Sequence, residues 1–265
     1  MNFMEGRPTK NREYIPVFGD IHGNIMGLYN TLLYLERKSG VRIDYVLQLG
    51  DMGFLRELVE TDKIRSKTDI ELFSELKYPT KEFTQLKKKI AAEIYFIRGN
   101  HDDNHSLLNL QKNNPQGIIR VSKELPLYYI PDGRTILIGD VPIISYGGID
   151  PETRPKKAMR NPRIGFSEEG LSRIIDEAEN TGGILLTHQG SERTAKGSRE
   201  IDEICKVVNP KIHIHGHAHK RSLILIGNIP SYGLAKMPSE KRPYEYSKDF
   251  YGILNLNDLK FSFED

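Results

Sequence analysis

The sequence predicts an α/β fold in which two packed β-sheets are flanked by helices. Over the first hundred residues, short apolar runs alternate with longer stretches of helical spacing, and this order implies parallel strands joined by crossover helices. After residue 117, short β-like runs are separated by proline and glycine, as in strands joined by turns. The pattern contains no internal repeat. We therefore expect a single domain over residues 13–265, preceded by a flexible polar tail over residues 1–12.

The first hundred residues contain three apolar runs of strand length. We expect these strands at 14–18, 43–49 and 93–97. Helices are expected between them at 24–38, 68–77 and 80–92. Gly40 suits the end of the first helix, Pro79 separates the other two, and a loop of mixed charge at 52–67 precedes them.

The rest of the chain predicts more strands, mostly shorter. We expect them at 118–121, 127–130, 134–139, 142–146, 183–187, 211–215, 221–226 and 250–256. One helix is expected at 167–180, where Ser167 is a suitable N-cap, and another near 199–208. Residues 150–165 contain three prolines and are expected to form a basic loop. Its five positive side chains are Arg154, Lys156, Lys157, Arg160 and Arg163.

Composition narrows the class of protein. The chain has 265 residues and a formal net charge of +2, so its global charge does not indicate a nucleic-acid partner. Its single cysteine, Cys205, cannot form an internal disulfide, and we interpret it as a small buried apolar residue. Since no apolar run is long enough to span a membrane and no apolar signal region begins the chain, we expect a cytoplasmic protein without a membrane partner.

Polar side chains with lone pairs follow several of the predicted strands. Four of the eight histidines fall within residues 213–219. A buried strand holds a side chain rigidly, and the loop after it opens a concave edge. Mixed histidine and carboxylate ligands suit Mn, Fe or Zn better than Ca, and a carboxylate can bridge two ions. We therefore predict a two-metal hydrolytic centre from Asp20, His22, Asp51, Asn100, His188, His217 and His219, with Asp51 as the bridge.

The motifs Gly-Asp-Ile-His-Gly, Gly-Asp, Gly-Asn-His-Asp, a lone His and Gly-His-Ala-His occur in this order over residues 19–219. Together they resemble those of the calcineurin-like metallophosphoesterases, and the middle segment is loosely similar to uncharacterised microbial and phage members. The resemblance implies a four-layer α-β-β-α sandwich of two mixed sheets between helices. It also implies that Asp20, His22 and His219 bind one metal, that Asn100, His188 and His217 bind the second, and that Asp51 bridges them.

The resemblance further implies a mechanism. Two divalent transition-metal ions, with Mn the preferred choice, would lie ~3.5–4 Å apart and share a water of lowered pKa. The resulting hydroxide would attack the phosphorus of a phosphomonoester or phosphodiester in line with the leaving group. His101 matches the catalytic histidine of the family and would act as general acid. Arg98 could assist with phosphate, and a structural salt bridge is an equal alternative.

Several residues depart from the pattern of the protein-phosphatase branch, whose second motif is Gly-Asp-x-x-Asp-Arg-Gly. Phe54 replaces the aspartate that would orient the catalytic histidine, and Leu55 replaces the phosphate-binding arginine. Asp102 stands where that branch carries glutamate. These differences argue against a Ser/Thr protein phosphatase, and they leave His101 without an obvious orienting carboxylate.

Several alternatives accompany this interpretation. A non-catalytic scaffold of the same fold could lose ligands without penalty, whereas this chain retains all of them, so we favour an enzyme. A nuclease is a further alternative, with a small phosphate ester slightly favoured as substrate because the net charge is low. The basic loop has no interleaved aromatic residues and is a weak signature of nucleic-acid binding.

The other histidines and the other metal motifs have simpler explanations. We expect His213 to be a hydrogen-bonded core residue, His215 to support the centre without being a ligand, and His105 to be exposed. A metallo-β-lactamase signature would need aspartate where this chain has Ala218, and no nucleotide-binding P-loop occurs.

Overall fold

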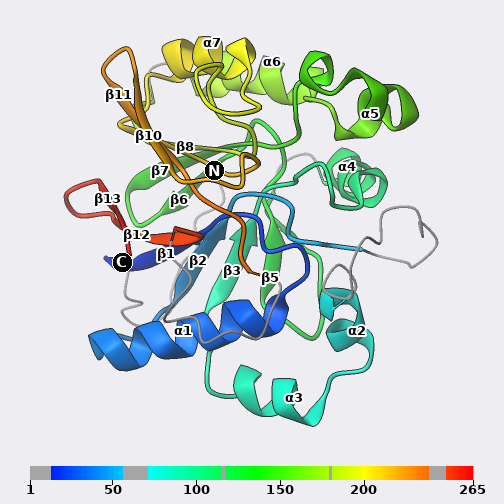
Figure 1. Ribbon diagram of the computed structural model, residues 1–265, viewed down its shortest axis with the longest axis vertical. Helices are drawn as coiled ribbons and strands as arrows, with labels where there is room; N and C mark the ends of the chain where they lie inside the picture. Colours follow the sequence, from blue (N-terminus) through cyan, green and yellow to red (C-terminus); the bar gives the residue numbers. More distant parts are fainter. Residues whose placement is uncertain (1–12, 56–70, 115–116, 179–180, 239–248, 265) are drawn as a thin grey trace.

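Two mixed β-sheets pack face to face between two sets of helices (Figure 1). The computed structural model describes residues 13–55, 71–114, 117–178, 181–238 and 249–264. The predicted tail at 1–12 and most of the predicted loop at 52–67 lie outside these residues. The four layers confirm the predicted fold class. None of the described helices is long and apolar enough to cross a bilayer.

The first sheet has seven strands, and its middle is parallel. The strand order is β13 (Lys260–Phe263), β12 (Tyr251–Asn255), β1 (Ile15–Phe18), β2 (Tyr45–Gln48), β3 (Glu93–Phe96), β5 (Leu127–Tyr129) and β4 (Ile119–Arg120). Strands β1, β2, β3 and β5 run parallel to one another, while β12, β13 and β4 are antiparallel to their neighbours. The carboxyl ends of β1, β2 and β3 therefore meet at one edge of the sheet.

The second sheet has six strands, and its middle is parallel too. The order is β10 (Ser222–Ile226), β11 (Ile229–Gly233), β9 (Ile212–His215), β8 (Ile184–Thr187), β7 (Val141–Tyr146) and β6 (Thr135–Ile138). Strands β7, β8, β9 and β11 run parallel, and the two outer strands, β6 and β10, are antiparallel to their neighbours. The sequence did not predict β11, since Pro230 interrupts its apolar pattern, nor the short C-terminal strand β13.

Seven α-helices are described. They are α1 (Ile25–Ser39), α2 (Glu71–Lys77), α3 (Lys81–Lys87), α4 (Asn104–Asn113), α5 (Pro155–Arg160), α6 (Glu168–Glu177) and α7 (Arg199–Val208). The predicted boundaries hold best for α1, whose N-cap Asn24 accepts a hydrogen bond from the Gly27 amide and whose C-cap Gly40 is left-handed. Figure 1 shows α1, α2 and α3 below the first sheet, with α6 and α7 above the second.

The segment 150–165 is not the loop that we expected. It forms helix α5 between two 3₁₀ helices, Pro151–Thr153 and Pro162–Ile164. A proline begins each of the three, because proline lacks the amide hydrogen that the first turn leaves unpaired in any case. Helix α4 was missed as well, since its sequence is polar and few of its residues are buried. Its N-cap is Asp103.

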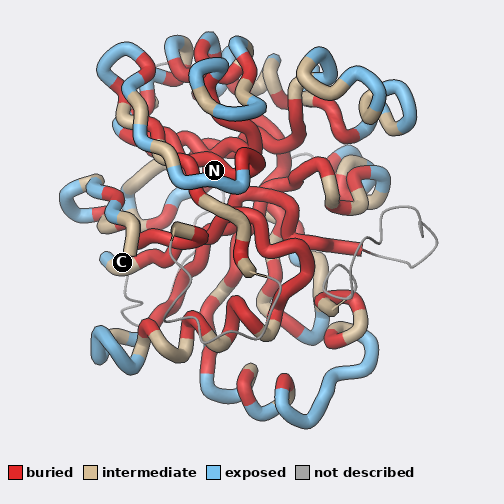
Figure 2. The backbone as a smooth tube through the Cα atoms, viewed as in Figure 1, coloured by how far each residue is buried: buried red, intermediate tan, exposed pale blue. Residues whose placement is uncertain are grey.

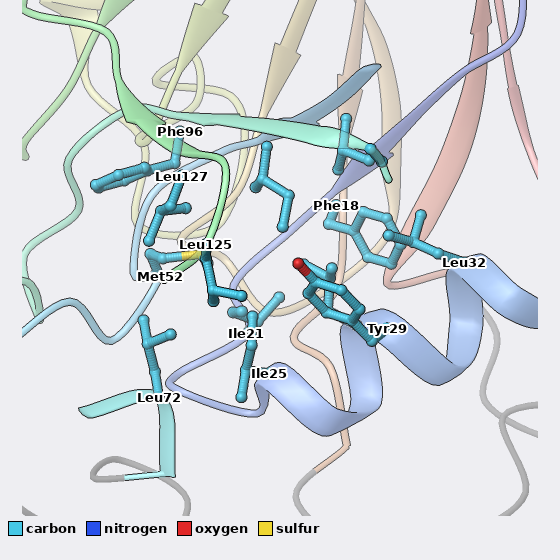
Figure 3. Close-up of a cluster of buried hydrophobic side chains, with 14 of the residues drawn as sticks. Phe18, Ile21, Ile25, Tyr29, Leu32, Met52, Leu72, Phe96, Leu125 and Leu127 are labelled. Atoms are coloured by element: carbon cyan, nitrogen blue, oxygen red, sulfur yellow. The ribbon is translucent and has the colours of Figure 1, made fainter. Parts of the chain in front are cut away.

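Three hydrophobic clusters fill the spaces between the four layers. Successive residues of a central strand point to opposite faces, so Val46 belongs to the cluster under α1 while Leu47 belongs to the cluster between the sheets. Figure 3 shows Tyr29 and Leu32 of α1 among the side chains of the first cluster. Buried Cys205 lies in the third cluster, as expected. Figure 2 shows that exposed residues concentrate on the outer helices and turns.

Arg98 is a structural residue, which decides between its two predicted roles. Its side chain is fully buried, and its Nε donates to Oδ2 of buried Asp132 at 2.6 Å. Its guanidinium also donates to the carbonyl oxygens of Arg163 at 3.1 Å and Gly165 at 2.8 Å. Arg98 thus ties the end of β3 to the end of the segment that contains α5.

We expect Asp132→Asn to lower the free energy of unfolding by about 3 kcal/mol, because the Arg98 charge would stay buried without its counterion. Urea unfolding measures this change. Glu264→Gln is the matched control, since it removes a surface pair in which Lys38 Nζ lies 3.0 Å from Glu264, and its cost should be under about 1 kcal/mol. Equal costs for the two variants would contradict the assigned importance of the buried pair.

Candidate metal centre

The predicted ligands lie where the parallel strands of both sheets end. Asp20, Asp51 and Asn100 follow β1, β2 and β3 of the first sheet, while His188 and His217 follow β8 and β9 of the second. All five are buried. The packing of the two sheets therefore brings together residues that are far apart in the sequence.

Four side chains form the first group of candidate ligands. The ligand atoms of Asp20, His22, Asp51 and His219 all lie within 4.8 Å of one another. Nε2 of His219 is 2.8 Å from Oδ2 of Asp20, and Nε2 of His22 is 3.6 Å from Oδ2 of Asp51. This spacing allows one ion to contact all four residues.

The second group shares Asp51 with the first. It contains Asp51, His188 and His217, whose ligand atoms again lie within 4.8 Å of one another. Nε2 of His188 is 3.5 Å from Oδ1 of Asp51 and 3.4 Å from Oδ1 of Asn100. The geometry thus brings together all seven residues singled out in the sequence, with Asp51 common to both groups.

Hydrogen bonds from the protein fix the orientation of these side chains. Nδ1 of His188 donates to the Leu49 carbonyl at 2.8 Å, which leaves Nε2 directed at Asp51 and Asn100. Oδ1 of Asp20 accepts the His217 amide at 2.9 Å, and Oδ1 of Asp51 accepts the His101 amide at 2.6 Å. Asp20 therefore contacts the backbone through one oxygen and faces the centre with the other, whereas both oxygens of Asp51 lie toward candidate ligands, Oδ1 toward His188 and Oδ2 toward His22.

Asp102 connects the second and third motifs. Its Oδ1 accepts the amides of Gly53 and Phe54 at 2.9 and 3.0 Å, and its Oδ2 accepts the Gly99 amide at 2.7 Å. Burial, with the neighbouring Asp51 charge, raises the pKa of Asp102 to about 6. Gly99 lies so close to Asp51 that a Cβ there would collide with the Asp51 backbone and carboxylate. The two motifs are consequently locked together beneath the candidate ligands.

Left-handed backbone is concentrated at the candidate ligands. Eight non-glycine residues among those described have positive φ, and four of them are His22 (46°), Asp51 (52°), His217 (60°) and His219 (58°). This conformation costs a non-glycine residue roughly 1–2 kcal/mol. Such strain persists where function needs a side chain in one particular direction.

The protonation of the centre suits metal binding. Burial lowers the pKa of His217 to about 3 and also lowers that of His22, so both imidazoles are neutral and keep a lone pair near pH 7. Burial opposes ionisation of Asp51. The charges of His188, His101 and His22 at the low pH where a carboxyl titrates outweigh this effect and hold the Asp51 pKa below its usual value.

Several buried polar atoms at the centre have no hydrogen-bond partner among the described residues. Two of them are Oδ2 of Asp51 and Nε2 of His217. A buried polar atom without a partner is costly unless something else binds it. Both are lone-pair donors that face the centre, so the residues present fit a pair of divalent cations.

His101 lies at the edge of the centre and contacts a lysine. Its ring meets that of His22 edge-on, with centroids 5.1 Å apart, and Nζ of Lys157 is 3.4 Å from its Nε2. Phe54 packs against Phe96 in the core, and Leu55 is buried. Neither can replace the aspartate or the arginine of the protein-phosphatase pattern. The sequence placed Lys157 in a basic group, but nothing in it distinguished Lys157 from the other four.

His213 and His105 behave as expected, and the supporting role of His215 stays a prediction. His213 is fully buried, and its two ring nitrogens contact the hydroxyls of Thr187 at 2.7 Å and Ser231 at 2.8 Å. His215 stacks on His213 and contacts the Gly216 carbonyl through Nδ1 at 3.1 Å, outside both ligand groups. His105 is exposed on α4.

Comparison with known proteins supports one family. The chain matches the calcineurin-like phosphoesterase family over residues 15–221. A lariat debranching enzyme of Entamoeba histolytica is 26% identical over 160 residues, which cover 58% of this chain but only 40% of that protein.

Solved structures agree in fold. The protein TT1561 of Thermus thermophilus has a TM-score of 0.54 at 14% identity, covering 96% of this chain and 98% of that chain. A second crystal structure has a TM-score of 0.55 at 13% identity, with the same two coverages. At this identity the likeness shows a shared fold. With the match over residues 15–221, it follows that the chain belongs to the calcineurin-like phosphoesterases, a family of phosphoester-hydrolysing enzymes.

Proposed function

We propose that this chain is a dinuclear metal-dependent phosphoesterase that hydrolyses a phosphomonoester or a phosphodiester. The observation that carries the proposal is that two groups of candidate ligand atoms share one buried carboxylate, Asp51. Imidazole, carboxylate and amide ligands in one site suit divalent transition metals, and we favour Mn²⁺ over Fe²⁺ and Zn²⁺. A cytoplasmic location and a single domain over residues 13–265 stay predictions.

The residues of the centre have two kinds of role in the proposed reaction: they hold the ions, or they transfer a proton. When bound, the two ions would supply the Lewis acidity that activates a water for attack on phosphorus and would offset charge on the phosphoryl oxygens. His101 is placed beside the centre to donate a proton to the leaving oxygen. The ions would be held by Asp20, His22 and His219 on one side and by Asn100, His188 and His217 on the other, with Asp51 between them.

Two other functions are open to the same fold. A phosphodiesterase acting on nucleic acid is supported by the similarity to a lariat debranching enzyme. We favour a small phosphate ester because the net charge of +2 supplies little long-range attraction for a polyanion. A non-catalytic scaffold is the less favoured alternative, since a scaffold has no need for four strained ligand positions.

Asp51→Asn should remove most of the activity and lower the metal content below two ions per chain. The substitution keeps the shape of the side chain but removes the charge that serves both ions. Metal analysis and turnover of an aryl phosphate with Mn²⁺ would be measured on the same sample. Two bound metals together with the full rate would disprove the dinuclear assignment.

His101→Ala should slow turnover by ~10²-fold or more without loss of metal, as expected for removal of a general acid. The loss should shrink for substrates with good leaving groups, because these need less protonation. His105→Ala, on the exposed side of α4, is the control and should behave as the unaltered protein. Equal losses for good and poor leaving groups would exclude the acid role of His101.

Replacing the basic residues of the segment 150–165 other than Lys157 with glutamine tests the class of substrate. The four are Arg154, Lys156, Arg160 and Arg163. If the substrate is small, hydrolysis of both an aryl phosphate and an oligonucleotide should be unaffected, since neither depends on these charges. A KM for oligonucleotides that rises in the variant, with a weaker dependence on salt, would instead support a nucleic-acid substrate.

A further inference from the structure

Helix α5 is held against the metal centre at both ends of its segment. At the carboxyl end, buried Arg98 binds the carbonyl of Gly165 at 2.8 Å. At the amino end, buried Gln189 accepts the Asp150 amide at 2.6 Å and donates to the Thr153 hydroxyl at 3.0 Å. Arg98 stands two residues before Asn100, and Gln189 directly follows His188. The position of α5 is therefore fixed by neighbours of two candidate ligands.

This anchoring directs one basic side chain of α5 at His101. Nζ of Lys157 lies 3.4 Å from Nε2 of His101, and Lys157 is half-buried, whereas its helix neighbours Lys156 and Arg160 are exposed. An ammonium group only donates hydrogen bonds, so Nε2 of His101 is the acceptor in this contact. The helix thus places a positive charge beside the residue that we expect to act on the leaving oxygen.

On the basis of the proposed phosphoesterase activity, we propose that Lys157 binds the non-bridging oxygens of the scissile phosphate and thereby favours phosphomonoesters over phosphodiesters. The arginine that binds phosphate in the protein-phosphatase pattern is absent, since Leu55 is apolar and buried. A lysine has a flexible stem and a compact charge. When a phosphate draws Lys157 toward its oxygens, Nε2 of His101 loses this hydrogen bond and can take up a proton from solvent, which it then gives to the leaving oxygen.

The preference follows from charge. A phosphomonoester carries close to two negative charges above its second pKa of about 6, and a diester carries one. Attraction to a fixed cation is proportional to that charge and grows where water is excluded. Lys157 should therefore stabilise the bound monoester more than the bound diester.

The test compares Lys157→Met with Lys156→Met in the full chain loaded with Mn²⁺. For an aryl phosphate, kcat/KM should fall about 10- to 100-fold in Lys157→Met, which corresponds to one lost charge contact of a partly buried group. For a bis(aryl) phosphate the loss should be under about threefold, and Lys157→Arg should recover part of the monoester activity. Lys156→Met should match the unaltered protein on both esters.

Binding of inorganic phosphate provides a readout that does not depend on turnover. Calorimetry should show Kd rising about tenfold in Lys157→Met and unchanged in Lys156→Met, with equal metal content in both. Equal losses on the two esters, or unchanged phosphate binding, would overturn the proposed role of Lys157. If the unaltered chain hydrolyses neither ester with metals bound, the proposed function fails instead, and the phosphate titration still decides whether Lys157 binds the anion.

Discussion

Two fully buried carboxylates, Asp20 and Asp51, determine how the rest of the structure is arranged. They end adjacent parallel strands of the first sheet, in a place where an uncompensated negative charge would be very costly. Imidazole partners come from across the sandwich, because His188, His217 and His219 follow strands of the second sheet. Together with the carboxylates they offer lone pairs to the cations that would offset this charge. Packing of the sheets and assembly of the centre are thus one event: the hydrophobic cluster between the sheets brings the carboxylates of one sheet next to imidazoles of the other.

The departures from the protein-phosphatase pattern form a consistent local structure. Phe54 extends the core under the second motif, and Asp102 replaces a longer acidic residue with one that binds three backbone amides. Rigidity near the centre therefore comes from packing and from backbone contacts. A polar contact to the His101 ring instead comes from α5, an element outside the motifs. The motifs thus contribute the candidate ligands, while the intervening segment contributes a cation beside His101.

The sequence predicted most of the strands and all members of the candidate centre, because each ligand closely follows an apolar run and carries a distinctive side chain. Elements without a clear apolar pattern were harder to predict. Helix α4 is polar along most of its length, and Pro230 interrupts the apolar pattern of β11. The helical structure of residues 150–165 could not be predicted either. Its helical turns depend on Arg98 and Gln189, which are distant in sequence, and so does the selection of Lys157 from five similar cations.

The left-handed backbone at His22, Asp51, His217 and His219 has a consequence for engineering of this protein. Glycine or asparagine adopts that conformation more easily than histidine or aspartate, so substitution there would relieve strain in the folded chain. In the metal-free chain, selection for thermal tolerance alone would thus favour loss of the candidate ligands, whereas bound ions would oppose it by stabilising the folded state. Engineering of a more thermostable variant should therefore keep these four residues unchanged and place stabilising substitutions in the outer helices.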